Sequence, residues 1–340
     1  MKGLKYILLL AVLFTLGACQ RSQEERNRIL KVYNWADYID EDVLAEFPDW
    51  YKEQTGEDIE VIYQTFDINE IMLTKIERGH EDFDVVCPSE YIIERMMKKD
   101  MLQPINRDFG NTPDYIPNLA PYIQEELNKM SFDERKVTDY AVAYMWGTAG
   151  VLYNKGLVTE EEALTCGSLW DPKFNNKILM KDSYRDCYGL SIIYANTERL
   201  QKGEVTVEQL MNDNSKDAIV MAEEYLKMMK PNIAGWEADF GKEMMTKGKA
   251  WLNFTWSGDA VWAIEEAAAV DVELDYVVPI EGSNVWFDGW VIPKYARNVK
   301  AASYFINYMC RPDIALRNMD AIGYVSAVAT PEILEEKIDT

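Results

Sequence analysis

The chain has 340 residues, of which 48% are hydrophobic and 12% aromatic, and its formal net charge is −23. This length predicts two units of ordinary domain size, and the composition excludes a disordered chain. The charge argues against a nucleic-acid-binding protein and against anionic substrates held by basic clusters, but acidic surfaces are too common to identify a cationic ligand.

The first residues have the pattern of an export signal. Lys2 and Lys5 precede an apolar run, residues 6–16, which is too short for a comfortable membrane span and matches a signal-peptide core. Small residues then lead to Cys19, which resembles the lipobox of bacterial lipoproteins. We expect residues 1–18 to be a signal peptide, Cys19 to carry a lipid and residues 19–28 to be a polar tether. An ordinary signal peptide with an incidental cysteine is the alternative.

Strand-like and helix-like segments then alternate, which predicts an α/β fold. Strands are expected at residues 29–34, 60–64, 84–87, 250–256 and 275–278. Helices are expected at residues 41–55, 69–78, from 88 onward, and at 218–229, 241–247 and 300–309, with a short helix from Ile314. Asp40 is the predicted N-cap of the first helix, Gly56 its C-cap, and Pro48 is expected to bend or split it.

The cysteines and the single histidine indicate neither a disulfide framework nor a metal site. Cys87, Cys166, Cys187 and Cys310 have no CxxC spacing, so buried free thiols are expected, although disulfides stay possible. His80 is expected at the surface. The chain has no GxSxG, P-loop, dinucleotide-binding or HExxH motif. We therefore expect no cofactor, no metal and no catalytic residue, with a hydrolase based on paired carboxylates as an alternative.

Five short segments place an aromatic side chain near a carboxylate, beside a glycine, a proline or a strand end. They are residues 35–38, 89–91, 182–186, 256–259 and 286–288. Ligands of open α/β sheets bind beyond the carboxyl ends of strands. An alkyl polyammonium needs carboxylates for its ammonium groups and aromatic faces for its methylene chain. Because each segment alone also fits a core aromatic beside a cap or turn, and sugar sites combine the same residues, this pattern predicts a cation or sugar site.

These segments, taken in order, resemble the spermidine/putrescine-binding periplasmic protein family of bacterial ABC importers. The matches run from about residue 29 to about residue 330 and include residues 32–39, 83–89, 143–147, 168–172, 256–259, 286–288, 305–313 and 322–324. The resemblance implies a two-lobed periplasmic-binding-protein (type II) fold with mixed sheets and flanking helices. The first lobe would contain residues 29–147 and 287–332, the second residues 148–286 and 333–340, with the ligand in the cleft between them.

The function implied by this resemblance is capture of spermidine or putrescine for delivery to an ABC permease, without catalysis. The protein would be a monomer in the periplasm or at the cell surface, held to the membrane only by its lipid, and would not bind nucleic acid. A binding protein for another small solute, such as a quaternary amine or a sugar, is the alternative.

By position, the resemblance also implies the ligand-binding residues. These are Trp35, Asp37, Tyr38, Ser89, Tyr91, Asp186, Trp256, Asp259, Trp286, Asp288 and Tyr324. Asp288 would be the main acid, while Asp259 matches an acid of putrescine-type members, and Tyr91 and Trp286 lean toward the spermidine type. The chain departs from the family at two site positions: Ala36, where members carry a hydroxyl, and Ser183, where spermidine-type members tend to carry an acid. It also has an apparent insertion at residues 47–51 and a shorter tail after Tyr324.

Overall fold

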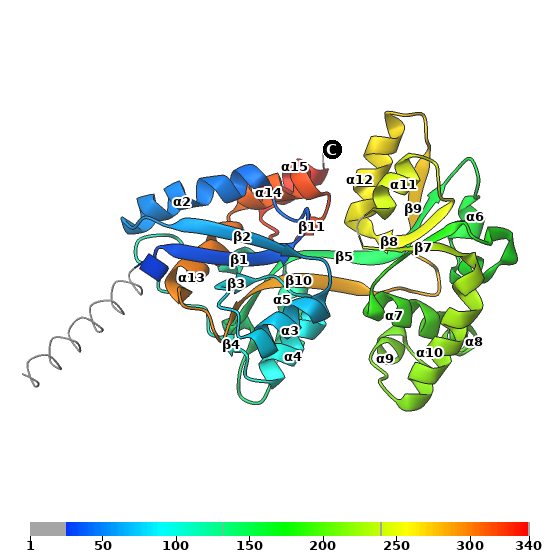
Figure 1. The fold of residues 1–340 in the computed structure, drawn as a ribbon, viewed down its shortest axis with the longest axis horizontal. Helices are drawn as coiled ribbons and strands as arrows, with labels where there is room; N and C mark the ends of the chain where they lie inside the picture. The colour runs from blue at the N-terminus through cyan, green and yellow to red at the C-terminus, as the bar shows by residue number, and fades with distance from the viewer. Residues whose placement is uncertain (1–24, 131, 239, 339–340) are drawn as a thin grey trace, which may run out of the picture. The chain divides into compact units, whose positions relative to one another are not determined.

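The computed structural model describes residues 25–130, 132–238 and 240–338, so the predicted signal peptide, Cys19 and most of the predicted tether lie outside the described residues. The chain separates into two compact units (Figure 1). Unit 1 contains the described chain up to Tyr144, Asp288–Asn318 and the described chain from Ser326, and unit 2 contains Met145–Phe287 and Met319–Val325. The predicted two-lobed α/β fold is confirmed.

The unit boundaries differ from the predicted ones near the C-terminus. Residues 319–325 lie in unit 2, because the ring of Tyr324 packs against Gly258. The chain from Ser326 onward lies in unit 1 rather than in the second lobe, because its backbone donates a hydrogen bond to the carbonyl of Tyr144 at 2.8 Å.

The folded part of unit 1 begins before residue 29, inside the predicted tether. Arg26 is only 8% exposed, and its guanidinium pairs with Asp82 at 3.1 Å and with Asp84 at 2.8 Å. A buried charge needs a charged partner, so these contacts tie residue 26 to the fold. The predicted tether is therefore too long at its C-terminal end.

Unit 1 is built on a sheet whose parallel strands have the order β2-β1-β3, followed by an antiparallel β10. The strands are β1 (Ile29–Trp35), β2 (Glu60–Phe66), β3 (Val85–Val86), β4 (Leu102–Gln103), which pairs with β10, and β10 (Val285–Pro293), which enters from unit 2. Because β1 lies between β2 and β3, right-handed crossovers put α2 (Glu41–Thr55) and α3 (Asn69–Gly79) on opposite faces, as Figure 1 shows.

The ends of α2 confirm the predicted caps. The carboxylate of Asp40 accepts a hydrogen bond from the N–H of Asp42 at 2.8 Å, and Gly56, with φ of 75°, ends the helix in the left-handed conformation that glycine adopts without strain. The helix is continuous through Pro48 rather than split. Phe47 holds it in place by an edge-on contact with Phe305, with 5.2 Å between ring centroids.

The remaining helices of unit 1 are α4 (Glu90–Lys98), α5 (Pro121–Lys129), α13 (Val299–Met309), α14 (Pro312–Ile322), whose last residues lie in unit 2, and α15 (Pro331–Ile338). The helix expected from Ile314 begins at Pro312 instead, because proline fits the first turn, where its missing N–H has no partner to lose. None of the helices in the described part of the chain combines the length and the apolar character needed to cross a bilayer.

Unit 2 is built on a sheet with the order β9-β5-β8-β6-β7. Its strands are β5 (Ala141–Asn154), which enters from unit 1, β6 (Ile178–Lys181), β7 (Ile233–Glu237), β8 (Leu252–Trp256) and β9 (Leu274–Val277). Of these, β6 is parallel to both β7 and β8, and β5 is antiparallel to β8 and β9. The strands predicted at 250–256 and 275–278 are confirmed.

Helices cover both faces of this sheet (Figure 1). One face carries α7 (Tyr184–Ala195), α8 (Thr197–Gln201), α9 (Val207–Met211) and α10 (Lys216–Met229), and the other carries α11 (Gly241–Thr246) and α12 (Ser257–Ala268), while α6 (Glu160–Ala163) follows β5. Ile178 and Met180 of β6 pack into the core with residues of α7, and Leu179 packs into a second core with residues of α12. Because strand side chains alternate, Lys181 at the end of β6 follows Leu179 toward α12.

The four described cysteines are buried and free, as predicted. Burial, helped by the charge of Asp186, raises the pKa of Cys187 to about 12, and burial raises the pKa of Cys310 to about 12 as well. His80 is exposed, as predicted. Within the described residues, no group of three or more His, Cys, Asp or Glu side chains is placed to hold a metal ion.

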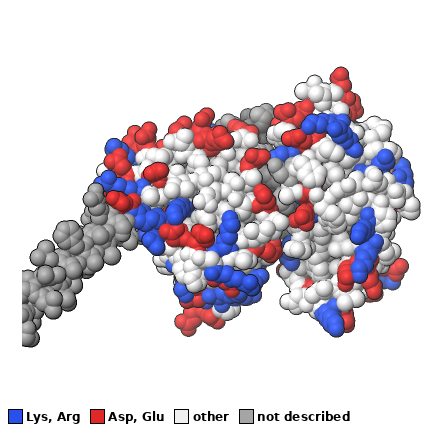
Figure 2. Space-filling model, in the orientation of Figure 1, with Lys and Arg blue, Asp and Glu red and all other residues white. Residues whose placement is uncertain are grey.

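Part of the excess of acidic over basic residues lies on the exposed surface of helix α2. On unit 1, Figure 2 shows acidic side chains along α2, whose exposed acids are Glu41, Asp42, Glu46, Asp49 and Glu53. Asp42 lies in the first turn, where negative charge is favoured by the helix dipole, and Glu46 pairs with Arg317 at 2.7 Å. These acids are accounted for by the fold and do not require a cationic ligand.

Candidate functional site

In unit 1, three predicted residues meet at the carboxylate of Asp288. The Tyr38 hydroxyl donates to Oδ2 at 2.9 Å and the Ser89 hydroxyl donates to Oδ1 at 2.6 Å. Tyr38 follows β1, Ser89 follows β3, and Asp288 lies in β10, where it forms an antiparallel bridge with Ser89. Asp288 is 5% exposed. Two hydroxyls therefore hold a nearly buried carboxylate in a fixed position.

Tyr91 joins this group through Asn69, which the sequence analysis missed. The amide of Asn69 donates to the Ser89 hydroxyl at 2.9 Å and to the Tyr91 hydroxyl at 3.1 Å. Tyr91 in turn donates to Glu70 at 3.1 Å. Burial raises the pKa of Tyr91, and the charge of Glu70 raises it further, so Tyr91 stays a hydrogen-bond donor at neutral pH. The available sequence signal was an amide at the first residue of a helix.

Trp35 and Asp37 lie next to Tyr38 at the end of β1. Trp35 is half-buried and packs against Phe66, with 4.6 Å between ring centroids. Asp37 is exposed and has a φ of 50°, a left-handed conformation that aspartate tolerates better than most residues. The end of β1 thus carries an aromatic residue and the loop after it a carboxylate, both close to Tyr38 in the sequence.

In unit 2, a second group of predicted residues surrounds Lys181, which the sequence analysis did not consider. The strands β6, β7 and β8 end at Lys181, Glu237 and Trp256, respectively. Because β6 is parallel to both neighbours, these last residues lie at the same edge of the sheet, and the register pairs Lys181 directly with Glu237. Asp259 follows in the first turn of α12.

The ammonium of Lys181 uses all three of its N–H donors. It donates to Asp259 Oδ2 at 2.7 Å, to the Ala238 carbonyl at 2.7 Å and to Glu237 Oε2 at 3.3 Å, and it lies 4.3 Å from the ring centroid of Trp256. Burial acts to lower the pKa of Lys181, but the charges of Asp259 and Glu237 outweigh it and raise that pKa above its ordinary value. Lys181 is therefore a buried cation at neutral pH.

Two other predicted residues, Tyr324 and Trp286, complete this group. The hydroxyl of Tyr324 donates to Asp259 Oδ1 at 3.1 Å, so that both oxygens of Asp259 have a donor. The ring of Trp286 lies 5.5 Å from that of Tyr324 and 6.4 Å from that of Trp256, both edge-on. The structure thus brings an acid and three aromatic rings together around the lysine.

Asp186 positions one of these rings. Its Oδ2 accepts a hydrogen bond from the indole N–H of Trp256 at 2.9 Å, and its Oδ1 accepts one from the Asn284 amide at 3.0 Å. The side chain is nearly buried. Asn284, which the sequence analysis also missed, precedes β10 and anchors Asp186 from the other side.

The contact between Tyr324 and Gly258 makes a testable prediction. A Cβ at position 258 would come within 2.4 Å of the Tyr324 ring. We expect Gly258→Ala to displace that ring, to weaken its hydrogen bond to Asp259 and to lower the free energy of unfolding by about 1–3 kcal/mol. Urea unfolding followed by tryptophan fluorescence measures this loss. Gly79→Ala is the control, because its Cβ would meet only the flexible Glu81 side chain, at 3.5 Å; equal stability of the two variants would contradict the prediction.

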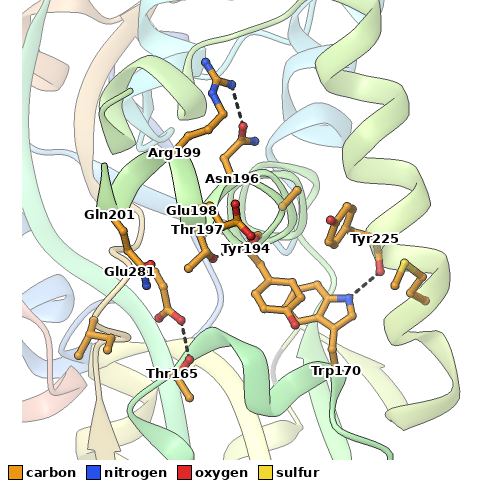
Figure 3. A pocket seen from close by; sticks show the side chains of 13 residues that line it. Thr165, Trp170, Tyr194, Asn196, Thr197, Glu198, Arg199, Gln201, Tyr225 and Glu281 are labelled. Carbon is orange, nitrogen blue, oxygen red and sulfur yellow. Dashed lines mark hydrogen bonds between the residues drawn. The ribbon is translucent and has the colours of Figure 1, made fainter. Parts of the chain in front are cut away.

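A separate hollow of about 800 Å³ in unit 2 has none of the predicted residues in its lining. Figure 3 shows Trp170 stacked on Tyr194, with 4.0 Å between ring centroids, and the Trp170 indole donating to the carbonyl of Tyr225 at 2.8 Å. On the other side, the hydroxyl of Thr165 donates to Glu281. Because Lys181, Asp259 and Trp256 are absent from its lining, the hollow is distinct from the acid–aromatic group around Lys181.

The chain matches one family model over most of its length. The model of the bacterial extracellular solute-binding proteins matches residues 48–337. Among curated relatives, the spermidine/putrescine-binding periplasmic protein of Salmonella typhimurium is 29% identical over 313 residues, 92% of this chain and 80% of that protein. The putrescine-binding periplasmic protein PotF of Escherichia coli is 29% identical over 318 residues, 91% and 81% of the respective chains.

Solved structures are similar over the same span. One from Listeria monocytogenes is 35% identical, with a TM-score of 0.73, and the match covers 91% of this chain and 88% of that one. The spermidine/putrescine ABC transporter substrate-binding protein PotD from Streptococcus pneumoniae is 32% identical, with a TM-score of 0.66 and the same coverage.

Proposed function

Because the chain belongs to the bacterial extracellular solute-binding proteins, we propose that it binds a polyamine, spermidine or putrescine, outside the cytoplasm and delivers it to the permease of an ABC importer. The names of its relatives support this ligand class and this partner. Those relatives are transport proteins that bind their substrates, so the proposal is for binding without catalysis.

The observation that carries the proposal is the nearly buried carboxylate of Asp288, held by Tyr38 and Ser89. A carboxylate offers about four acceptor positions, so it can hold two hydroxyls and an ammonium at the same time. An ammonium bound there would form a charge-assisted hydrogen bond, which is about twice as strong as a neutral one. The geometry therefore suits one end of an alkylammonium.

Each unit also has aromatic rings able to bind the alkyl part of a polyamine. In unit 2, three rings lie close together, those of Trp256, Trp286 and Tyr324. In unit 1, Trp35 supplies one half-buried ring. Such rings bind methylene groups and attract a nearby cation by about 0.5–2 kcal/mol per contact. A quaternary amine has no N–H to donate to Asp288, and a neutral sugar could donate a hydroxyl but would leave the buried negative charge without a cation.

The proposal includes export of the protein and anchoring of a monomer to the membrane by lipid at Cys19. It is supported by the apolar run that precedes this cysteine and by the lipobox-like residues between them. Mass spectrometry of the protein extracted from a bacterial membrane tests this part. We expect the mature chain to begin at a lipid-modified Cys19; an unmodified chain that begins elsewhere would contradict the anchor.

Ligand binding is tested with the purified protein by thermal shift and calorimetry. A ligand that binds only the folded state at 100 times its Kd adds about 2.7 kcal/mol to stability, so a polyamine should raise the melting temperature clearly. The panel contains spermidine, putrescine, glycine betaine and glucose. Stabilisation by betaine or glucose but by neither polyamine would overturn the proposed ligand class, and turnover of a glycoside would overturn the absence of catalysis.

A further inference from the structure

We propose that Lys181 is a specificity-determining residue, which fills an ammonium position in unit 2 with the protein's own cation and so favours a diamine over a longer triamine. This inference rests on the proposed polyamine-binding function and adds to it a choice between ligands of that class.

The position of the Lys181 ammonium has every feature that a bound primary ammonium requires. Asp259 and Glu237 supply negative charge, a backbone carbonyl supplies the third acceptor, and the face of Trp256 lies 4.3 Å away. A primary ammonium has three donors, and each has an acceptor here. A ligand ammonium brought to Asp259 would therefore compete with a cation that is already fully hydrogen-bonded.

The exposure of these side chains shows which partner a ligand could reach. Lys181 is 1% exposed and Glu237 is 0% exposed, whereas 14% of the Asp259 side chain is exposed. Glu237 is also held from within, because it accepts hydrogen bonds from the backbone of Gly241 at 3.1 Å and from Asn253 at 3.3 Å. The lysine thus approaches Asp259 from the interior, and only the outer side of Asp259 can meet a ligand.

The charge of the group leads to the same conclusion. Three carboxylates, Asp186, Glu237 and Asp259, lie around Trp256 and Lys181. A buried ammonium needs a compensating carboxylate. The charge of Lys181 therefore lowers by one the number of ligand ammonium groups that these three carboxylates can neutralise. Spermidine carries one ammonium group more than putrescine. Lys181 therefore lowers the affinity for the triamine spermidine more than the affinity for the diamine putrescine.

The main experiment compares the wild-type protein with Lys181→Met by calorimetry with putrescine and with spermidine. Methionine keeps the apolar stem and removes the charge. We expect the wild type to prefer putrescine, and the ratio of the two affinities to shift toward spermidine in the variant by at least about tenfold, the size of one hydrogen bond to a charged group. Lys181→Arg keeps the charge and should keep the preference for putrescine.

Lys177→Met is the matched control. Lys177 lies just before β6 in the same unit, and its ammonium is also over a tryptophan, 5.2 Å from the ring centroid of Trp251. Its removal deletes a lysine–tryptophan contact of the same kind outside the Asp259 group. We expect the affinity ratio of Lys177→Met to equal that of the wild type.

A second variant protects the test against loss of folding. Lys181→Met alone leaves the buried Glu237 and the partly exposed Asp259 without their lysine, so Lys181→Met/Glu237→Gln removes one charge of each sign. Gly241 and Asn253 donate to different oxygens of Glu237, so the single carbonyl oxygen of glutamine can keep the hydrogen bond from Gly241. We expect spermidine to raise the melting temperature of the double variant more than putrescine does, and the reverse order in the wild type.

Two results would overturn the inference while leaving the proposed function intact. One is an unchanged affinity ratio in Lys181→Met and in Lys181→Met/Glu237→Gln while polyamine binding persists. The other is a failure of both variants to fold even in saturating spermidine, which would make Lys181 a purely structural partner of Glu237 and Asp259. Absence of any polyamine binding by the wild-type protein is a different result, because it refutes the proposed function itself and the inference with it.

Discussion

Asp288→Asn is expected to weaken polyamine binding by about 2–5 kcal/mol, or at least roughly 30-fold in Kd. Asparagine has nearly the same shape and can still accept a hydrogen bond from Tyr38 or Ser89, but it lacks the negative charge that pairs with the ligand ammonium. Calorimetric titration with spermidine and with putrescine measures the effect, and a thermal melt without ligand shows whether the variant is folded.

The control for this variant is Asp49→Asn. Asp49 is an exposed acid of α2 in the same unit, so its replacement makes the same change of net charge away from Asp288. We expect its affinity to equal that of the wild type. If Asp288→Asn is folded and binds both polyamines as tightly as Asp49→Asn does, Asp288 is not the acid that holds the ligand.

Asp84→Asn is expected to cause the largest loss of stability, about 3–5 kcal/mol in the free energy of unfolding, because it removes one partner of a buried ion pair. Asp84 is fully buried. Its Oδ2 accepts from Arg26 at 2.8 Å and from the backbone of Lys31 at 2.9 Å, and its Oδ1 accepts from the backbone of Arg297 and Asn298, both at 2.9 Å. One carboxylate thus joins the start of the fold, β1 and the loop before α13.

Urea unfolding monitored by circular dichroism measures this loss. Asp58→Asn serves as the control, because the pair that Asp58 forms with Lys52 at 2.7 Å is exposed and such pairs add little to stability. A midpoint for Asp84→Asn close to that of Asp58→Asn would show that the four hydrogen bonds to Asp84 do not hold unit 1 together.

The fold of unit 1 could be predicted closely where the signals were local. Asp40 and Gly56 marked both ends of α2, and alternating apolar residues marked β1 and β2. Of the bend or split expected at Pro48, the split is wrong, because the helix continues through Pro48; beside it, Phe47 packs against Phe305, a residue 258 positions further along the chain. Elements with weaker local patterns, such as β6, α7 and β10, were not predicted.

The candidate site was predicted in part. The acids and aromatic residues next to strand ends were visible because ligands of α/β sheets bind there, and the structure groups Tyr38, Ser89 and Asp288 as well as Trp256, Asp259 and Tyr324. Asn69 and Asn284 were missed, because they act by holding other predicted residues. Lys181 was missed because the pattern sought carboxylates and aromatic residues for a cationic ligand, and Lys181 is itself a cation, directly before the segment 182–186.

Local sequence pattern alone predicted the α/β class, an export signal and the types of residue that can bind a cation. It could do so because helix caps, strand alternation and apolar runs depend on residues that are neighbours in the chain. The partners of Lys181 became known only from the folded protein. They come from the ends of two other strands, β7 and β8, and from the start of α12. Their contact with Lys181 depends on the parallel register that sets Lys181 opposite Glu237 and on the alternation that turns Lys181 toward Asp259. No stretch of neighbouring residues encodes that register, because it is set by packing across the whole sheet.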